Sequence, residues 1–546
     1  MFQKTKSSAL FAGLVVFLAV QVSTSTITAS NPITSYQAAA SVEMKYVSQF
    51  DGADVGARIN AADASCGSRP CTIYVDVQGS IATHVVLHSY HTLWFGLGDW
   101  TCATVNRAPN NDTPFDLESF TTVRGSGWGT RIAEPTVPGL LYVFFLTNNR
   151  ALGSINKYVT ISDLQIIGAS AENSGAMSTI DLGNCLHCSV HNVLLNDTGA
   201  IGVAVGNSAL PGAPVSITNA SNASPIVITT ATPHGYETGE ETTIASVRGN
   251  TAANGKFVVT VTDATHFTIG VGGNGSYISG GTARKNAHAM DVTVSECSFF
   301  KVATQNLALV NGKDIHFINN KFRASGDTAS NGTSLDLEPN SAGDWISEFE
   351  ISGNIFDASQ SHFYTVAIQI YDTQESGIVS HNIIKGGPFA RGVSCERCNN
   401  IVIEGNQISN VSQPAIAIAP CNGCSVINND IRNAGSASNE AIVVGGPTTN
   451  SNISFNRIYP ISGGHSSVLS AYRSVGNTYL DNIGVTYANT TTSSLIRDSN
   501  GVAFANLPLA KDGSEIYCSN CRKTTPCTAG GTGAVAKYLN GAKDCN

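Results

Sequence analysis

Short stretches in which apolar and polar residues alternate recur along the second half of the chain. Five of them read ISEFEISGNIFDAS, ESGIVSHNIIKGG, NNIVIEGNQISNVS, GCSVINNDIRNAG and NSNISFNRIYPIS. Each combines a short strand pattern of period two, an asparagine, an apolar pair and a polar break. No helical periodicity separates these units, so the pattern predicts a succession of β-strands.

An asparagine recurs in these units at intervals of 23 to 34 residues, at Asn320, Asn354, Asn382, Asn406, Asn429, Asn456 and Asn482. A repeat of this length built only from strands is typical of a parallel β-solenoid, in which stacked rungs bury one continuous core. Asparagine suits the bend because it tolerates left-handed backbone and can hydrogen-bond to its neighbour on the next rung. The sequence therefore predicts an all-β, parallel β-helix fold.

One segment, residues 212–284, breaks the repeat with longer alternating strands and no asparagine bend. Its removal restores an ordinary rung length, which predicts a small all-β domain inserted in a loop. We expect a capping helix and first rungs at 41–133, further rungs at 134–211 and 285–500, and a separate C-terminal module at 501–546. In the expected cap, Val55, Ile59 and Ala62 recur at helical spacing, and Cys66 and Cys71 flank the following turn.

The first 29 residues have the pattern of a secretory signal peptide. Lys4 and Lys6 precede the apolar run ALFAGLVVFLAVQV, and small polar residues follow it. The run is short for a membrane span. We expect a secreted, extracellular protein without a membrane anchor after cleavage; the alternative is an uncleaved anchor.

Eight of the 14 cysteines form four CxxC pairs, Cys185/Cys188, Cys395/Cys398, Cys421/Cys424 and Cys518/Cys521. Behind a signal peptide these pairs favour structural disulfides over zinc or redox chemistry. Four cysteines in the last thirty residues indicate a disulfide-rich C-terminal module. Only 13% of the residues are charged, the net charge is −9, and no basic block occurs, which argues against nucleic acid as the main partner.

Together, the opening ADVGARINAADASCGSRPCTIYVDVQG, glycine-rich rungs such as TTVRGSGWGTRI and the asparagine repeat resemble the pectate-lyase-like superfamily of right-handed parallel β-helices. The resemblance covers most of residues 50–490 except the insert. It implies the fold and a role on carbohydrates, since this superfamily contains polysaccharide lyases, polygalacturonase-type hydrolases, phage tailspikes and adhesins. The opening has less glycine before the first strand than is usual there and lacks a Pro-Gly turn after it.

Aligning the strands at 306–310, 334–338, 367–371, 392–396, 415–419 and 441–445 identifies the candidate chemistry. The second and fourth positions are apolar and are expected to face the core, so the third and fifth face outward. The third-position column reads Ala308, Asp336, Gln369, Ser394, Ala417 and Val443. The fifth-position column reads Val310, Glu338, Tyr371, Glu396, Ala419 and Gly445. The polar residues are confined to three neighbouring rungs.

Rungs about 4.8 Å apart would bring these groups to one sugar-sized site. We predict Asp336 and Glu338 as catalytic carboxylates, because paired carboxylates repel each other's ionisation and divide into a proton donor and a base or nucleophile. Glycoside hydrolysis requires such a pair. The predicted substrate-binding residues are Gln369, Tyr371, Asp372, Glu396 and His362.

Two alternatives stay open beside a polysaccharide hydrolase, which itself needs no cofactor. A uronate lyase would hold Ca²⁺ on Asp336, Glu338 and Glu396. It would take its base from Arg391, Arg397 or Lys385, none of which lies in an outward column. A non-catalytic carbohydrate-binding or adhesive solenoid needs neither. The polysaccharide and the oligomeric state are not indicated.

Overall fold

The protein is described by a computed structural model. It describes residues 42–103, 113–135, 143–147, 155–168, 178–199, 201–206, 213–286, 288–324, 332–340, 344–358, 365–373, 375–386, 389–435, 440–459, 468–471, 475–490 and 495–546. The expected signal peptide lies outside these residues, and the described strands and helices belong to one compact unit, Glu43–Asn546.

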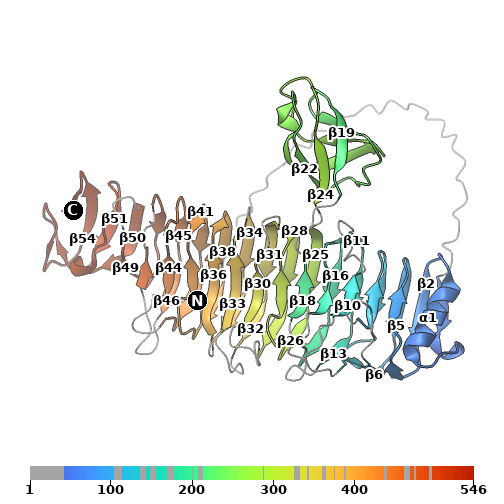
Figure 1. Cartoon of the computed structure of the whole chain (residues 1–546). Coiled ribbons are helices and arrows are strands. Elements are labelled where there is room, and N and C mark those ends of the chain that lie inside the picture. The colour runs from blue at the N-terminus through green and yellow to red at the C-terminus, as the bar shows by residue number, and fades with distance from the viewer. Residues whose placement is uncertain are drawn as a thin grey trace, which may run out of the picture. The chain divides into compact units, whose positions relative to one another are not determined.

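Parallel strands of successive rungs pair into three long sheets (Figure 1). One rung consists of β28 (Gly312–Ile318) in a 20-stranded sheet, here sheet A, β29 (Lys321–Arg323) in a 12-stranded sheet, sheet B, and β30 (Thr333–Leu337) in a 13-stranded sheet, sheet C. The next rung, β31 (Ile346–Ser352), β32 (Ile355–Asp357) and β33 (Thr365–Tyr371), pairs with it in parallel on all three sheets. The predicted parallel β-helix is confirmed.

Side chains at every second strand position line the interior and stack from rung to rung. In sheet B, for example, the rings of Phe299, Phe322 and Phe356 stack with centroids 5.0 Å and 4.6 Å apart. Such columns form one continuous buried core, in which each rung covers the apolar side chains of its neighbours.

The asparagine ladder forms at the bend between sheets A and B. Asn382 Nδ2 donates to Asn406 Oδ1 at 3.0 Å, and the same oxygen accepts the backbone N–H of Asn382 at 3.0 Å. Six such side-chain contacts join the seven predicted asparagines, all fully buried. The expected left-handed backbone at these asparagines is wrong: the positive φ belongs to the preceding residue, as in His381 (φ 55°). That residue turns the chain, which leaves the asparagine amide free to bridge rungs.

Helix α1 (Val55–Cys66) precedes the first rung of the β-helix. The Asp54 carboxylate caps it by accepting the backbone N–H groups of Gly56 and Ala57. The residues predicted to face the core, Val55, Ile59 and Ala62, are buried. A disulfide between Cys66 and Cys71 closes the turn to β2 (Cys71–Val75).

The buried Asp63 of α1 holds two histidines of the first rungs. His91 Nδ1 lies 2.6 Å from Asp63 Oδ1, and His88 Nδ1 contacts Asp63 Oδ2. His91 is buried, whereas the side chain of His88 is 55% exposed. Because Asp63 accepts its hydrogen bond, the pKa of His88 is raised.

The insert forms a closed six-stranded barrel with a core of its own, as predicted. Its strands are β19 (Val215–Ala220), β20 (Ile226–Thr230), β21 (Glu241–Ala245), β22 (Gly255–Asp263), β23 (His266–Ile269) and β24 (Thr282–Asn286). The side chains of Ile228, Val259 and Phe267 lie in its centre. This core explains the longer alternating strands of the segment.

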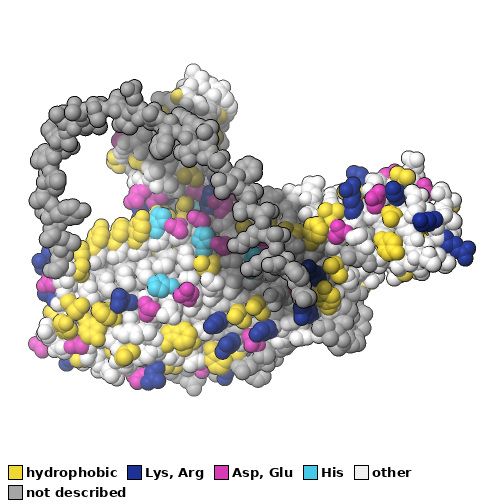
Figure 2. Space-filling model, turned by 180° about the vertical axis from the view of Figure 1, so that it is seen from behind, with side chains coloured by type: hydrophobic (Ala, Val, Ile, Leu, Met, Phe, Trp, Pro, Cys, Tyr) yellow, Lys and Arg dark blue, Asp and Glu magenta, His cyan; other side chains and the backbone are white. Residues whose placement is uncertain are grey.

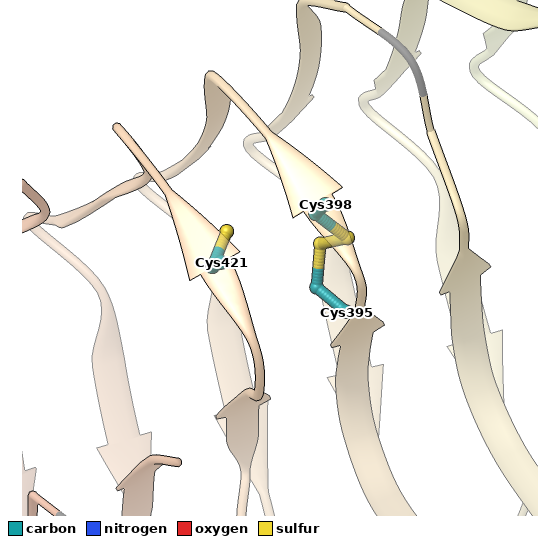
Figure 3. Close-up of side chains that lie close together, drawn as sticks. All are labelled: Cys395, Cys398 and Cys421. Atoms are coloured by element: carbon teal, nitrogen blue, oxygen red, sulfur yellow. A yellow bond between two sulfur atoms is a disulfide. The ribbon is translucent and has the colours of Figure 1, made fainter. Parts of the chain in front are cut away.

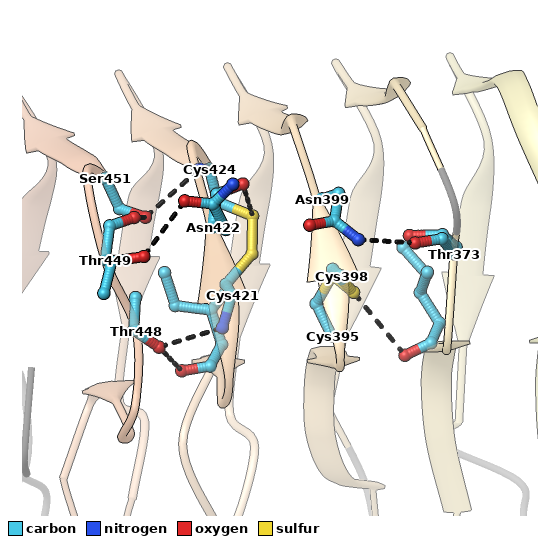
Figure 4. The surroundings of a disulfide bond; sticks show 12 residues. Thr373, Cys395, Cys398, Asn399, Cys421, Asn422, Cys424, Thr448, Thr449 and Ser451 are labelled. Carbon is cyan, nitrogen blue, oxygen red and sulfur yellow. Dashed lines mark hydrogen bonds between the residues drawn. A yellow bond between two sulfur atoms is a disulfide. The ribbon is translucent and has the colours of Figure 1, made fainter.

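Six disulfides form among the described residues, and they include the four CxxC pairs. In Figure 3 the Cys395–Cys398 bond lies beside Cys421, whose strand β41 (Cys421–Asn422) pairs with β37 (Cys398–Asn399). Cys421 and Cys424 are themselves bonded, and the hydroxyls of Thr448 and Ser451 accept their backbone N–H groups at 3.1 Å (Figure 4). The cysteines of the CxxC pairs therefore form disulfides, as expected for CxxC pairs that follow a signal peptide.

The C-terminal module contains β51 (Glu515–Cys518), β54 (Ala534–Leu539) and β55 (Ala542–Cys545) in antiparallel pairing. Two disulfides, Cys518–Cys521 and Cys527–Cys545, hold it. Among the described residues, no helix has the length and apolar character that a membrane crossing requires.

Candidate active site on sheet C

The strands of sheet C pair in the register expected from the sequence. Asp336 of β30 lies opposite Ala308 of β27 (Leu307–Leu309) and opposite Gln369 of β33. Gln369 in turn lies opposite Ser394 of β36 (Phe389–Glu396), which faces Ala417 of β40 (Ile416–Ile418). The interior neighbours Leu335 and Leu337 are buried, so the third position of each strand points away from the core.

This outward column is nevertheless mostly buried. Ala308, Asp336, Ser394 and Ala417 have exposed fractions of 7%, 8%, 0% and 9%. Asp336 is therefore not a solvated acid on an open sheet surface, which is the ordinary state of a strand carboxylate. The low exposure of Asp336 requires a specific environment for its carboxyl group.

Burial raises the pKa of Asp336 to about 6, and the nearby charge of Glu338 adds to this effect. The side-chain amide of Gln305 opposes it by donating to Asp336 Oδ2 at 3.3 Å. Glu338 is exposed and follows the last residue of β30, with its backbone N–H donating to Leu309 O at 3.0 Å. The two carboxyl groups thus differ in environment: one is buried and protonated up to about pH 6, and the other is in contact with solvent.

Two arginines accompany the acids on the neighbouring rungs. The Arg397 guanidinium lies 4.1 Å from the centroid of the Tyr371 ring and 3.7 Å from Asp372 Oδ2. Arg391 Nη1 donates to Ser394 Oγ at 3.3 Å and lies 4.0 Å from Glu396 Oε1. One face of Tyr371 is thus already occupied by Arg397, so only its other face and its edge remain for a sugar.

Of the other candidate residues, one lies on a different sheet and one is outside the described residues. Lys385 lies on β35 (Ile383–Lys385) of sheet B, and His362 lies outside the described residues. Gln369, Tyr371, Asp372 and Glu396 are partly exposed on two adjacent rungs.

A calcium site fits Asp336 poorly. A carboxyl group binds Ca²⁺ in its ionised form, but the buried Asp336 has a raised pKa and already accepts an amide hydrogen bond on one oxygen. Arg391 also approaches Glu396. The donor set therefore suits a proton donor better than a cation site.

Sequence reasoning missed three polar residues, two on strands of this sheet and one just before a strand. Gln305 precedes β27 and is not on an aligned strand position. Asp116 of β7 (Phe115–Leu117) and Asp181 of β14 (Ser178–Asp181) belong to the same column as Asp336 on earlier rungs, and both are buried. Extending the strand alignment toward the N-terminus through PFDL and STID would have found the last two.

No family model matches the sequence, and no curated protein matches it either. Among solved structures, the A-modules of the mannuronan C-5 epimerases AlgE6 and AlgE4 from Azotobacter vinelandii align at 11% and 10% identity with TM-scores of 0.46 and 0.47. These alignments cover 83% and 82% of this chain and 96% of each module.

A tailspike mutant of E. coli bacteriophage HK620, in complex with a pentasaccharide, aligns at 11% identity and a TM-score of 0.45, over 81% of this chain and 68% of its own. A tailspike of Acinetobacter baumannii bacteriophage Fri1, described as a capsular polysaccharide depolymerase, aligns at 11% identity and a TM-score of 0.33, over 86% of this chain and 63% of its own. These similarities concern the fold alone. The strand register itself identifies the chain as a parallel β-helix, the architecture that the sequence predicts.

Proposed function

We propose that this chain is a secreted glycoside hydrolase that cleaves a polysaccharide on sheet C. The observation that carries the proposal is the pair Asp336 and Glu338, in which the buried member has a pKa raised to about 6 and the other is exposed. Two carboxyl groups with separated proton affinities are what glycosidic bond cleavage needs. Secretion is part of the proposal and is supported by the disulfides and the N-terminal pattern.

In this proposal Asp336 is the general acid. Its carboxyl group is protonated below about pH 6, so it can donate a proton to the glycosidic oxygen as the bond to the leaving sugar breaks. Glu338, in contact with solvent, is the base that activates water or the nucleophile that attacks the sugar. Its negative charge also stabilises the positive charge that develops on the ring.

The neighbouring rungs supply polar contacts to the sugar. Gln369 lies beside Asp336 in register and offers both a donor and an acceptor. Arg391 and Arg397 are held by Glu396 and Asp372 and leave further guanidinium N–H groups for substrate hydroxyl or carboxylate oxygens.

The test is the release of reducing ends from a panel of polysaccharides. We expect release by the wild-type chain and a loss of at least about a hundredfold in Asp336→Asn and Glu338→Gln. Glu404→Gln is the matched control, because Glu404 lies on β38 (Ile401–Glu404) of sheet A. It is expected to retain full activity.

Other outcomes would contradict the proposal. Products absorbing as unsaturated uronides, formed only without chelator, would indicate a lyase. Polysaccharide binding without turnover in the wild type would indicate a non-catalytic solenoid. Equal activity in Asp336→Asn and in the wild type would remove the proposed acid.

A further inference from the structure

A second group of titratable side chains lies on sheet A, apart from the proposed catalytic pair. It begins where a stack of exposed aromatic rings ends. Tyr90, Phe120, Tyr158 and His187 stack in this order with centroids 4.9, 5.2 and 4.8 Å apart. Figure 2 shows histidine and acidic side chains gathered beside a row of hydrophobic side chains on one face of the molecule.

Beyond His187, the residues that continue this row of side chains are acidic instead of aromatic. His187 Nδ1 lies 2.5 Å from Oδ2 of Asp291 on β25 (Ala289–Ser295). The pairing of β25 with β28 places Asp314 beside Asp291 and His316 beside Thr293. One carboxylate oxygen of Asp291, one of Asp314 and one ring nitrogen of His316 all lie within 4.8 Å of one another.

Carboxylates contact both ring nitrogens of His316 and orient its imidazole. Its Nε2 lies 3.1 Å from Asp314 Oδ1, and its Nδ1 lies 3.1 Å from Oε2 of Glu350 on β31. The hydroxyl of Ser352 donates to Glu350 Oε1 at 2.6 Å. A histidine with a carboxylate on one nitrogen, itself held by a hydroxyl, has the arrangement of a metal ligand with its outer partner.

The charges of this group are unbalanced. Among the described residues, the ion pairs of Asp291, Asp314 and Glu350 involve only imidazoles. The nearest lysine along the chain, Lys313, pairs with Glu348 at 3.3 Å instead. No lysine or arginine in the described part of the chain pairs with any of these three carboxylates, so a bound cation would balance their charge.

We propose that Asp291, Asp314 and His316 bind a divalent cation of the Zn²⁺ type, with His187 and Glu350 as the partners that orient the ligands. The mixture of carboxylate and imidazole donors favours such an ion, because Ca²⁺ and Mg²⁺ take oxygen donors alone. The nitrogen donor, fixed on a β-strand, also distinguishes this group from a solvated acidic patch. The ion would join the rungs of β25 and β28, and through Glu350 also that of β31.

The proposal predicts that the untagged full-length chain binds one equivalent of Zn²⁺ at pH 7.5 in isothermal titration calorimetry. Binding stabilises the native state, so the melting temperature rises with Zn²⁺ concentration. We expect His316→Ala to weaken binding at least about tenfold, and Glu350→Gln to weaken it by about tenfold through the lost outer partner.

A second pair of variants distinguishes a loss of Zn²⁺ binding from a loss of folding. Asp291 and Asp314 are exposed and have positive φ values of 48° and 57°, a region that asparagine adopts readily, so Asp291→Asn and Asp314→Asn preserve the backbone. Each is expected to weaken Zn²⁺ binding without changing the melting temperature in the presence of chelator by more than a degree or two.

The matched control is His266→Ala in the barrel. His266 Nδ1 lies 2.9 Å from Asp263, and both side chains are exposed like those of His187 and Asp291. No third ligand donor accompanies this pair among the residues that the structure describes, so its loss should leave binding unchanged. The proposal is overturned if the wild type binds no Zn²⁺, or if His316→Ala and the two asparagine variants bind it as the wild type does. In either case His316 is simply a shared partner of Asp314 and Glu350.

Discussion

The side-chain amide of Gln305 donates a hydrogen bond to Asp336 Oδ2 at 3.3 Å, across two neighbouring rungs of sheet C. The amide favours the ionised carboxylate, whereas burial and the charge of Glu338 favour the protonated acid. Burial is the largest of these effects, and the balance leaves the pKa at about 6. The pKa of the proposed catalytic acid thus depends on groups from two rungs that are distant in sequence.

Gln305→Leu tests this balance. Loss of the amide donor removes an effect that lowers the pKa of Asp336, so the pKa should rise. If Asp336 is the general acid, kcat/KM falls as the pH rises through its pKa, and this alkaline limb should move to higher pH in the variant. A pH–rate profile measures the shift. A limb at the same pH in both proteins would show that another group titrates there.

Asp336→Asn should stabilise the protein at high pH. The folded pKa of about 6 exceeds the ordinary value of 3.8, so the ionised side chain disfavours the folded state once the pH has risen through both values. At pH 8 the variant removes this effect, and the free energy of unfolding should increase by about 1–3 kcal/mol. At pH 4 or below the gain should largely disappear. Denaturant unfolding at both pH values checks it, and an equal effect at pH 4 and pH 8 would contradict the assigned pKa.

Asn382→Ala should destabilise the β-helix strongly. The variant loses the bonds from Asn382 Nδ2 to Asn406 Oδ1 and to Ile351 O, and it removes the Asn382 Oδ1 acceptor of the Asn354 backbone N–H and side-chain amide. Unpaired buried polar groups of this kind cost about 2–4 kcal/mol in total. Asn506→Ala is the control, because Asn506 is exposed and outside the ladder. Thermal unfolding distinguishes them; similar losses in both variants would argue against a special role of the ladder.

His88→Ala should destabilise the N-terminal cap in a pH-dependent way. Asp63 raises the pKa of His88 in the folded state above its ordinary value of 6.5. The stabilisation is therefore complete below that value and disappears as the pH rises through the raised pKa. The loss on substitution should be larger at pH 5 than at pH 8. In the Asp63→Asn background the difference between the two pH values should vanish, and its persistence there would exclude Asp63 as the cause.

Local patterns along the chain determined the parallel β-helix, the cap and the barrel insert. Each rung repeats the same short strand and the same asparagine, so Asn354 and Asn382 could be aligned without knowing where either lies in space. The alternation of Leu335, Asp336 and Leu337 likewise determined which side chains face the core. Successive side chains of a strand point to opposite faces of the sheet, so the face of each residue can be read from its position in the alternating pattern.

Contacts between rungs were decided by the tertiary structure alone. The amide of Gln305 beside Asp336 leaves no periodic trace in the sequence. The 8% exposure of Asp336 also depends on what packs around sheet C and not on its strand pattern. The cluster of His187, Asp291, Asp314 and His316 gathers residues separated by up to 129 positions, with the barrel inserted between the first and the rest. Burial arises from such lateral packing, which is why the sequence pointed to the carboxylates while only the fold showed that Asp336 is buried and Glu338 exposed.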